Sequence, residues 1–348
     1  MSTNLIKMVM FSVFLTASVS ANAKVVIKLA TAAPKDSIWH ENLKKIDQRW
    51  QSATDGQVGL RIYAGTLGDE NDILRRIRVG QLDAGTITTA GLSSIDKATQ
   101  AMHIPLAFDS NEEMEYVRNG IAKELDPVLA ARGFKVLSWG EVGWIHFFSR
   151  KPVATPDDLR KQKLFVWSSG DSADGEKLWQ DFGFDIVALS STDIMAALQT
   201  GMIDAYTTPP LVALASQWFP FTPYMTDLKW APLMGATIIT EKGWKKIPAQ
   251  LRPELERIVF EEGLNLQLEV RRLEQQATDA MVKRGLKIVP VDVAARKAWQ
   301  EMAERGYAQI RGSVVPEKYF DETLRLRNEY RALQLANKVK PLVRKDES

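Results

Sequence analysis

The same short pattern occurs twice in this chain. Residues 72–84 read DILRRIRVGQLDA and residues 193–205 read DIMAALQTGMIDA, with identical Asp, Ile, Gly, Asp and Ala at a constant offset of 121 residues. In each copy a glycine, Gly80 or Gly201, stands where an amphipathic helix would end in the left-handed conformation. Chance similarity of two amphipathic helices is the alternative explanation. The preferred interpretation is that two domains use the same helix–strand unit in the same place.

Strand and helix patterns alternate around both copies of this repeat. Alternation of this kind argues for an α/β fold with mostly parallel sheets. Ser191 is a candidate cap for a helix that starts at Thr192. The predicted strands cover residues 25–31, 58–65, 83–89, 163–167, 184–190 and 203–209, and the predicted helices cover residues 36–56, 69–80, 172–183 and 191–201.

The repeat also predicts where a ligand would bind. In open α/β sheets, ligands lie beyond the carboxyl ends of the strands. The two copies place residues 86–89 and 206–209 at such ends, so the two ends would face each other across a cleft between the domains. The candidate ligand-binding residues there are Thr88, Thr89, Tyr206, Thr207 and Thr208.

A long helix is predicted over residues 253–284, where apolar residues recur with helical spacing and Pro253 suits the first turn. At 1.5 Å per residue it would be about 48 Å long, enough to brace both domains. A coiled-coil seam is the alternative. A strand is predicted at 286–292 and a helix at 316–335. The predicted division is residues 24–142 plus 231–270 for domain I, 143–230 plus 271–335 for domain II, and a charged tail at 336–348.

The amino-terminal residues indicate export. Residues 1–23 combine Lys7, an apolar run and a final Ala-Asn-Ala, which is typical of a cleaved secretory signal peptide. A membrane anchor is the alternative, although the run is short for a bilayer span. We therefore expect a soluble periplasmic protein. The near balance of 45 Lys and Arg against 43 Asp and Glu argues against a nucleic-acid partner, and the absence of cysteine excludes thiolate chemistry.

Catalytic and metal-binding patterns are missing from the sequence. The three histidines, His40, His103 and His146, form no HExxH pair, and no GxSxG motif is present. We predict no metal site and no cofactor, and we expect that the protein is not an enzyme. The alternative is a periplasmic enzyme on a binding-protein-like fold that uses Tyr206 or Asp204 as an acid or base.

Aromatic residues carry more information about a site. The chain has 10 tryptophans, and several fall where a strand is expected to meet a loop. Such junctions on one edge of an α/β sheet are where ligands bind. The candidates are Trp39, Trp144, Trp167 and Trp230.

Several stretches, in order, resemble one transport family. AGTLGDENDILRRIRVGQLDAG, IPLAFDSNEEM, KPVATPDDLRKQKLFVW and STDIMAALQTGMIDAYTTPP are similar to segments of the periplasmic solute-binding proteins of tripartite ATP-independent periplasmic (TRAP) transporters, of the dicarboxylate-binding DctP-like type. The resemblance covers nearly the whole chain after residue 23. It implies a two-domain periplasmic binding protein fold, type II-like, with a long helix bracing both domains.

The resemblance also implies the partners. Such proteins close around one solute and deliver it to a membrane permease with a small and a large subunit, and they hydrolyse nothing. A non-transport role, as a sensor or through docking to an additional periplasmic protein, is an open alternative.

This sequence departs from the family pattern at positions that contact the solute. Phe165 stands where typical members have an arginine that holds the solute's carboxylate, Ile145 stands about where a second arginine lies, and Thr208 replaces an asparagine. Strand alternation places Phe165 and Trp167 on one face, which we expect to line the cleft. We therefore expect an organic acid or related solute with a sizeable apolar part. A small-dicarboxylate binder that uses contacts other than arginine is the alternative.

Glu70 belongs to the family-like Gly-Thr-Leu-Gly-Asp-Glu segment. We place it among the candidate ligand-binding residues, at the edge of the cleft, where its carboxylate would accept a hydrogen bond. The alternative is a structural role, because a negative charge at a helix amino terminus is favoured by the helix dipole.

Overall fold

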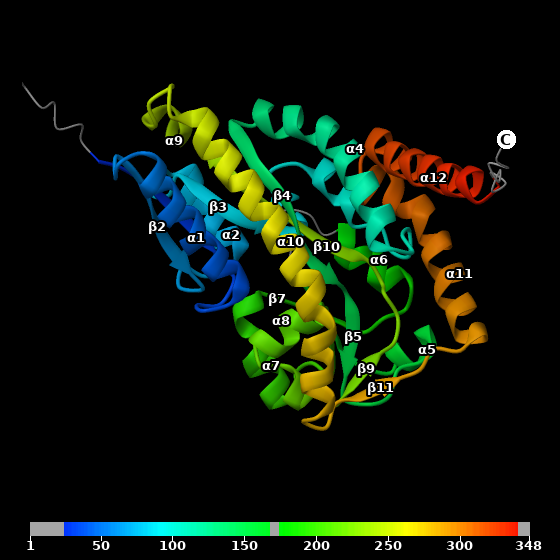
Figure 1. Ribbon diagram of the computed structural model, residues 1–348. Helices are drawn as coiled ribbons and strands as arrows, with labels where there is room; N and C mark the ends of the chain where they lie inside the picture. The colour runs from blue at the N-terminus through cyan, green and yellow to red at the C-terminus, as the bar shows by residue number, and fades with distance from the viewer. Residues whose placement is uncertain (1–23, 168–173, 340–348) are drawn as a thin grey trace, which may run out of the picture.

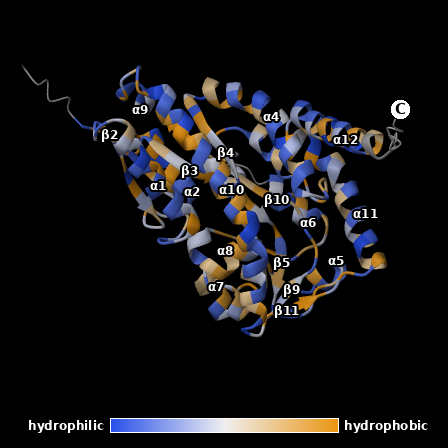
Figure 2. Ribbon diagram, in the orientation of Figure 1, coloured by the Kyte–Doolittle hydropathy of each residue, from blue (hydrophilic) through white to orange (hydrophobic). Residues whose placement is uncertain are grey.

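The computed structural model describes residues 24–167 and 174–339. The chain forms two β-sheets with helices around each, and α10 runs across the front of both (Figure 1). The predicted α/β fold is therefore confirmed. Figure 2 shows hydrophobic residues concentrated along the central strands and many hydrophilic residues along α11 and α12. None of the helices in the described ranges has the length and apolar character needed to cross a bilayer.

The first sheet has five strands in the order β2-β1-β3-β10-β4. Its strands are β1 (Val25–Thr31), β2 (Val58–Ala64), β3 (Ala84–Thr88), β4 (Phe134–Trp144) and β10 (Pro232–Thr240). The helical segments beside it are α1 (Ile38–Ala53), α2 (Glu70–Arg78), α3 (Thr89–Leu92), η1 (Lys97–Met102), α4 (Asn111–Ala131) and α9 (Glu241–Lys246).

The second sheet has six strands in the order β11-β9-β5-β8-β6-β7. Its strands are β5 (His146–Ser149), β6 (Leu164–Trp167), β7 (Ile186–Leu189), β8 (Ala205–Thr208), β9 (Tyr224–Thr226) and β11 (Lys287–Val289). The helical segments of this half are α5 (Pro156–Leu159), α6 (Asp174–Asp181), η2 (Ser191–Asp193), α7 (Ile194–Thr200), α8 (Pro210–Ala215), η3 (Phe219–Phe221), α11 (Val293–Gln309) and η4 (Ile310–Val314). The last helix, α12 (Glu317–Val339), packs against α4 of the first half.

Both sheets are mixed, whereas the sequence predicted mostly parallel pairing. β10 runs antiparallel to β3 and β4, and β5 runs antiparallel to β8 and β9. The chain passes from the first sheet to the second between β4 and β5, and returns between β9 and β10. Strand alternation shows which residues share a face but not which way a strand runs, so the pattern of β10 gave no sign of this reversal.

The long helix joins the two halves. α10 (Arg252–Val282) has 31 residues and a length of about 46 Å. It packs on α1 and β4 of the first half and on α8 of the second. The predicted brace of residues 253–284 is thus confirmed, one residue longer at its start and two shorter at its end.

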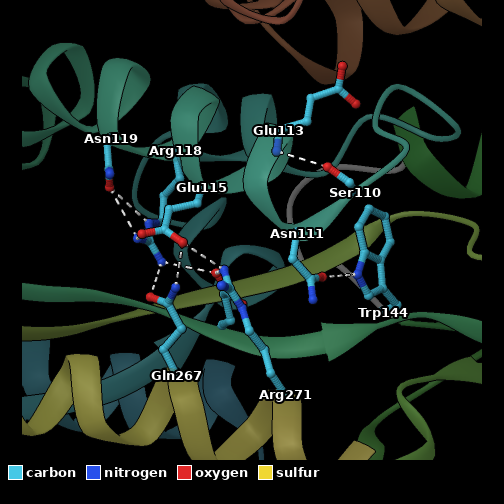
Figure 3. Close-up of polar contacts among 10 residues, drawn as sticks. Ser110, Asn111, Glu113, Glu115, Arg118, Asn119, Trp144, Gln267 and Arg271 are labelled. Atoms are coloured by element: carbon cyan, nitrogen blue, oxygen red, sulfur yellow. Dashed lines mark hydrogen bonds and ion pairs between the residues drawn. The ribbon is translucent and has the colours of Figure 1, made fainter. Parts of the chain in front are cut away.

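Buried charges fix the brace to the sheet. Arg118 of α4 donates to Glu141 of β4 at 3.2 Å and to Gln267 of α10 at 2.7 Å. Arg271, one turn further along α10, pairs with the same Glu141 at 2.6 Å and with Glu115 at 3.0 Å (Figure 3). Because each charge has a partner of opposite sign, the network satisfies groups that would be costly to bury alone.

The two repeat copies end as the sequence predicted. Gly80 has φ +74° and Gly201 has φ +72°, so both occupy the left-handed region after their helices. The predicted cap of the second copy is wrong by one residue. The hydroxyl of Ser190, not of Ser191, accepts from the backbone N–H of Thr192, because a short 3₁₀ turn precedes α7.

The repeated aspartates make equivalent hydrogen bonds in both copies. The backbone N–H of Asp83 donates to the carbonyl of Lys28 at 2.9 Å, and its carboxylate accepts from the N–H of Lys28 at 3.0 Å. Asp204 makes both bonds with the backbone of Lys163, at 2.8 and 3.2 Å. Each aspartate therefore fixes the register between its own strand and the neighbouring parallel strand.

Candidate ligand-binding cleft

A cavity of about 250 Å³ lies between the two sheets. From the first half it is lined by the carboxyl ends of β1 and β3 and by Glu70, and from the second half by the ends of β6 and β8, the turn after β7 and helix α8. Both repeat copies thus contribute strand ends to one hollow, as the rule for open α/β sheets predicts. We refer to this cavity as the cleft.

Glu70 and Thr88 lie on the wall that the first half supplies. The carboxylate of Glu70 accepts from the N–H of Thr88 at 2.7 Å, from its hydroxyl at 2.6 Å and from the N–H of Gly91 at 3.1 Å. Burial raises the pKa of Glu70, and these three hydrogen bonds oppose the rise. Glu70 therefore both lines the cleft and holds the start of α3 in place.

Two buried polar groups beside the cleft have no hydrogen-bond partner among the described residues. They are the indole N–H of Trp39, which lines the cleft and is 8% exposed, and the hydroxyl of Thr89, which is fully buried directly after Thr88. An unpaired buried donor costs about 1–3 kcal/mol, so a solute that accepts from Trp39 would recover this loss.

Trp167 lines the cleft, whereas Phe165 lies beneath it. Trp167 is 38% exposed and Phe165 only 1%, and their rings meet edge to face with centroids 5.3 Å apart. The two residues share one face of β6, as alternation predicted. Phe165 belongs to a buried cluster with Phe148 and Tyr206, so it supports the cleft wall instead of forming the cavity surface.

The residues predicted at the end of β8 separate in the same way. Thr208 lines the cleft. Tyr206 is fully buried, stacks on Phe148 with centroids 5.2 Å apart, and accepts a hydrogen bond from Thr222. Thr207 is half-buried and pairs with Phe147 across the sheet, outside the cleft lining.

Three other candidates lie away from the cleft lining. The indole of Trp144 donates to Asn111 at 2.6 Å and packs with residues of α4 (Figure 3). Ile145 packs in a separate core cluster that also contains Trp230. Trp230 lines a different cavity, beside α11. The sequence indicated that these three residues lie at strand ends, but not which side of the sheet their side chains occupy.

Some lining residues were missed by sequence reasoning. Thr31 is the last residue of β1 and Ser191 lies two residues after the end of β7, so the strand-end rule that selected Thr88 and Thr208 could have found them. Trp218 lies in a loop after α8 and had no such signal.

Among the described residues that line the cleft, Glu70 is the one ionisable side chain, and none is a lysine or arginine. The other polar groups of these residues are hydroxyls, backbone groups and the indole N–H groups of Trp39, Trp167 and Trp218. Recognition of a charged solute by the described wall would therefore depend on neutral hydrogen-bond donors, in contrast to bidentate contacts from a guanidinium group.

One hydrogen bond joins the two halves beside the cleft. The hydroxyl of Ser190, before η2, donates to the carboxylate of Asp69 at 2.7 Å. Asp69 also caps α2 by accepting from the N–H of Asp72 at 3.0 Å. The two partners precede the two copies of the repeated helix, one in each half, so this bond links the halves beside the cleft.

Among the described residues, one group has the spacing of metal ligands, formed by Asp36, His40 and Glu41. Nδ1 of His40 already accepts from the N–H of Asp36 at 3.0 Å, and Asp36 is exposed. Nothing else at this surface points to an ion.

Known proteins place the chain in a family. The model of the DctP family, bacterial extracellular solute-binding protein family 7, matches residues 29–312. The C4-dicarboxylate-binding periplasmic protein DctP of Rhodobacter capsulatus is 24% identical over 294 residues, which cover 83% of this chain and 87% of that protein.

Solved structures share the fold. A TRAP periplasmic solute-binding protein of Desulfovibrio salexigens with bound orotic acid has a TM-score of 0.80 at 20% identity, covering 89% of this chain and 99% of that one. The sugar acid binding protein DctPAm of Advenella mimigardefordensis, in complex with galactonate, has a TM-score of 0.81 at 16% identity, covering 88% and 99%. The chain therefore belongs to the DctP family of bacterial extracellular solute-binding proteins, the transport family that its sequence resembles.

Proposed function

We propose that this protein is the periplasmic solute-binding subunit of a TRAP-type secondary transporter. It captures an organic acid or related solute with a sizeable apolar part in the cleft and delivers it to a membrane permease. The observation that carries the proposal is the cavity of about 250 Å³ between the two sheets, whose described walls are largely apolar and hold no arginine or lysine.

The described walls favour an apolar body in the solute. Trp39, Trp167 and Trp218 contribute aromatic surface, and Val142, Val212 and Leu233 contribute aliphatic surface. Burial of an aromatic ring against such walls contributes several kcal/mol at about 25 cal/mol per Å². Aromatic, branched and fatty monocarboxylates combine this apolar body with one acid group.

The acid group would be held by neutral donors. The indole N–H of Trp39 is the first candidate, because it is buried and unpaired among the described residues. Thr31, Thr86 and Thr208 also line the cleft, and each carries a hydroxyl. The related proteins of known structure bind orotic acid and galactonate, which supports an acid as the solute class.

One alternative to transport, an enzyme, is weaker on specific grounds. Asp204 bonds to the backbone of Lys163 and pairs with Arg150, Tyr206 is fully buried, and neither lines the cleft, so neither has the position of a catalytic acid or base there. A sensor would bind the solute in the same cleft but would act without a permease. Solute uptake by membrane vesicles that contain the permease subunits, with and without this protein, separates transport from sensing.

The solute can be identified directly. Native mass spectrometry of freshly purified protein is expected to show a bound small molecule. Calorimetric titration should then give tighter binding for apolar monocarboxylates such as phenylacetate than for succinate. Submicromolar binding of succinate together with no binding of any apolar acid would refute an apolar cleft.

A matched pair of variants locates the binding. Val212→Phe fills the cleft and should weaken solute binding at least tenfold. Val282→Phe makes the same change at a position on α10 that is 44% exposed, and should leave binding unchanged. Equal affinities in the two variants would place the solute elsewhere.

A further inference from the structure

A second cavity lies on another side of the second sheet. It has a volume of about 160 Å³ and lies between α6, α11 and the loop after η1. We call it the α6–α11 pocket and define it by His103, Trp179, Phe182, Trp230, Met302 and Ile310. It shares no lining residue with the cleft, so a molecule could occupy either cavity independently.

The walls of this pocket are aromatic and held in place by one another. Trp179 lies 5.7 Å from Trp230 and meets Phe184 edge to face at 5.1 Å, both measured between ring centroids. An apolar cavity of about 150 Å³ in a protein core stays free of water and accepts a benzene ring. The α6–α11 pocket thus has the size and lining for one six-membered ring.

Its polar groups offer acceptors. Nδ1 of His103 lies 2.9 Å from the carbonyl of Pro232, which only accepts, so Nδ1 carries the proton. Burial lowers the pKa of His103, which keeps the ring neutral and leaves Nε2 as an acceptor. Gln100 donates its side-chain N–H to the carbonyl of Thr89 at 3.4 Å, which leaves the amide oxygen of Gln100 as a second acceptor.

The charge of the lining argues against an anionic ligand. The described lining of the α6–α11 pocket contains no lysine or arginine. Arg160 lies against the ring of Phe184 behind this lining, but it already donates to the carbonyl of Phe182 at 2.8 Å and pairs with Asp157, so a carboxylate in the pocket would lose its hydration without gaining an unpaired cation. His103 and Gln100 both line the pocket, so a hydroxyl or N–H on the ligand has two side chains there that can accept its hydrogen bond. No residue of α6 is buried, so ligand entry beside this helix requires little disruption of the core.

We infer that the α6–α11 pocket is a second ligand-binding site, and that it takes an uncharged single-ring aromatic molecule with a hydroxyl or N–H donor, of the phenol class. The site is separate from the cleft and does not depend on which solute the cleft binds.

The probes are 4-fluorophenol, fluorobenzene and 4-fluorobenzoate, followed by fluorine NMR on the purified full chain. We expect 4-fluorophenol to bind at least fivefold more tightly than fluorobenzene, because only the phenol supplies a donor. 4-Fluorobenzoate should not compete with 4-fluorophenol. Quenching of tryptophan fluorescence should accompany binding, since Trp179 and Trp230 line the pocket.

Variants assign the site. Ala303→Phe fills the pocket and should weaken 4-fluorophenol binding at least tenfold, whereas Val212→Phe fills only the cleft and should leave it unchanged. Gly306→Ala is the milder variant if Ala303→Phe fails to fold. Its added Cβ would lie 3.4 Å from the ring of Phe182, an ordinary contact, and should weaken binding about threefold.

Loss of 4-fluorophenol binding in Val212→Phe with full binding in the pocket variants would overturn the inference. Absence of binding at millimolar concentration in the wild-type protein would do the same.

Discussion

The hydrogen bond between Ser190 and Asp69 should control closure of the two halves. Ser190→Ala removes the hydroxyl that donates to Asp69 across the cleft at 2.7 Å. The change also removes two contacts within the same turn, a 3.0 Å hydrogen bond between the hydroxyls of Ser190 and Thr192 and a weak 3.4 Å bond from the N–H of Thr192. Asp69 keeps its bond from the N–H of Asp72, so the cap of α2 survives the substitution.

The expected magnitude follows from the solvation of Asp69. In the open protein, water replaces Ser190 as the donor, so the net loss is that of one ordinary hydrogen bond, about 1 kcal/mol. A loss of this size lowers the ratio of closed to open molecules about fivefold. If the solute is held only by the closed form, its apparent dissociation constant rises by up to the same factor.

Spin-label distance measurements test this without knowledge of the solute. The chain contains no cysteine, so Val79→Cys and Met202→Cys introduce two unique labels. These residues are 66% and 51% exposed and follow the equivalent helices of the two halves. The distance distribution between them should shift toward the longer population in Ser190→Ala.

Two controls make the result specific. Ser190→Thr keeps the hydroxyl and should restore the wild-type distribution. Thr200→Ala removes a hydroxyl that bonds only within its own helix, to Ala196 at 2.9 Å and Ala197 at 3.3 Å, and should have no effect on closure. An unchanged distribution in Ser190→Ala, or an equal shift in Thr200→Ala, would refute the assignment of this bond as a closing contact.

Three further substitutions test the interpretation of buried residues. Phe165→Arg places a charge at a position that is 1% exposed, so we expect a loss of about 4 kcal/mol or more and a melting temperature lower by about 10 °C, measured by calorimetry, without gain of succinate binding. Burial raises the pKa of Glu70 above its unfolded value, so the folded wild type holds this proton more tightly and loses stability as pH rises from about 4.5 through the folded pKa. The melting temperature of Glu70→Gln relative to wild type should therefore increase between pH 4 and pH 7, and a constant difference would contradict a raised pKa. Asp204→Asn weakens the bond to the N–H of Lys163 and the ion pair with Arg150, so it should cost about 1–3 kcal/mol in denaturant unfolding while solute affinity stays within twofold.

The fold was largely predictable because its signals are local. Gly80 and Gly201 end helices in a conformation that few other residues adopt, and helical spacing over residues 253–284 identified the brace. The direction of β10 was not predictable, since the same alternation fits a strand that runs either way. It depends on the chain returning from the second half, a contact between residues far apart in sequence.

The sequence predicted which edge of the sheets forms the candidate site, but not which side chains at that edge are exposed and which are buried. Alternation correctly placed Phe165 and Trp167 on one face of β6, yet only Trp167, at the strand's end, extends beyond the neighbouring elements. Phe165 lies two residues earlier, inside a buried cluster that also contains Tyr206 and Phe148. Trp230 likewise stands at a strand–loop junction, but on the side that faces α11. Which neighbours cover a side chain is a tertiary property that strand periodicity does not contain.

The position of the closing contact follows from the repeat itself. Asp69 and Ser190 are separated by 121 residues, which is the offset between the two repeat copies, so they are equivalent positions in the two halves. When two similar units face each other about an approximate two-fold axis, equivalent positions touch only where they lie beside that axis. An approximate two-fold axis that passes between the starts of α2 and η2 would produce this contact. Substitutions beside this axis should change closure, whereas the equivalent glycines at the far ends of the helices, Gly80 and Gly201, lie away from it and should affect only the local stability of each half.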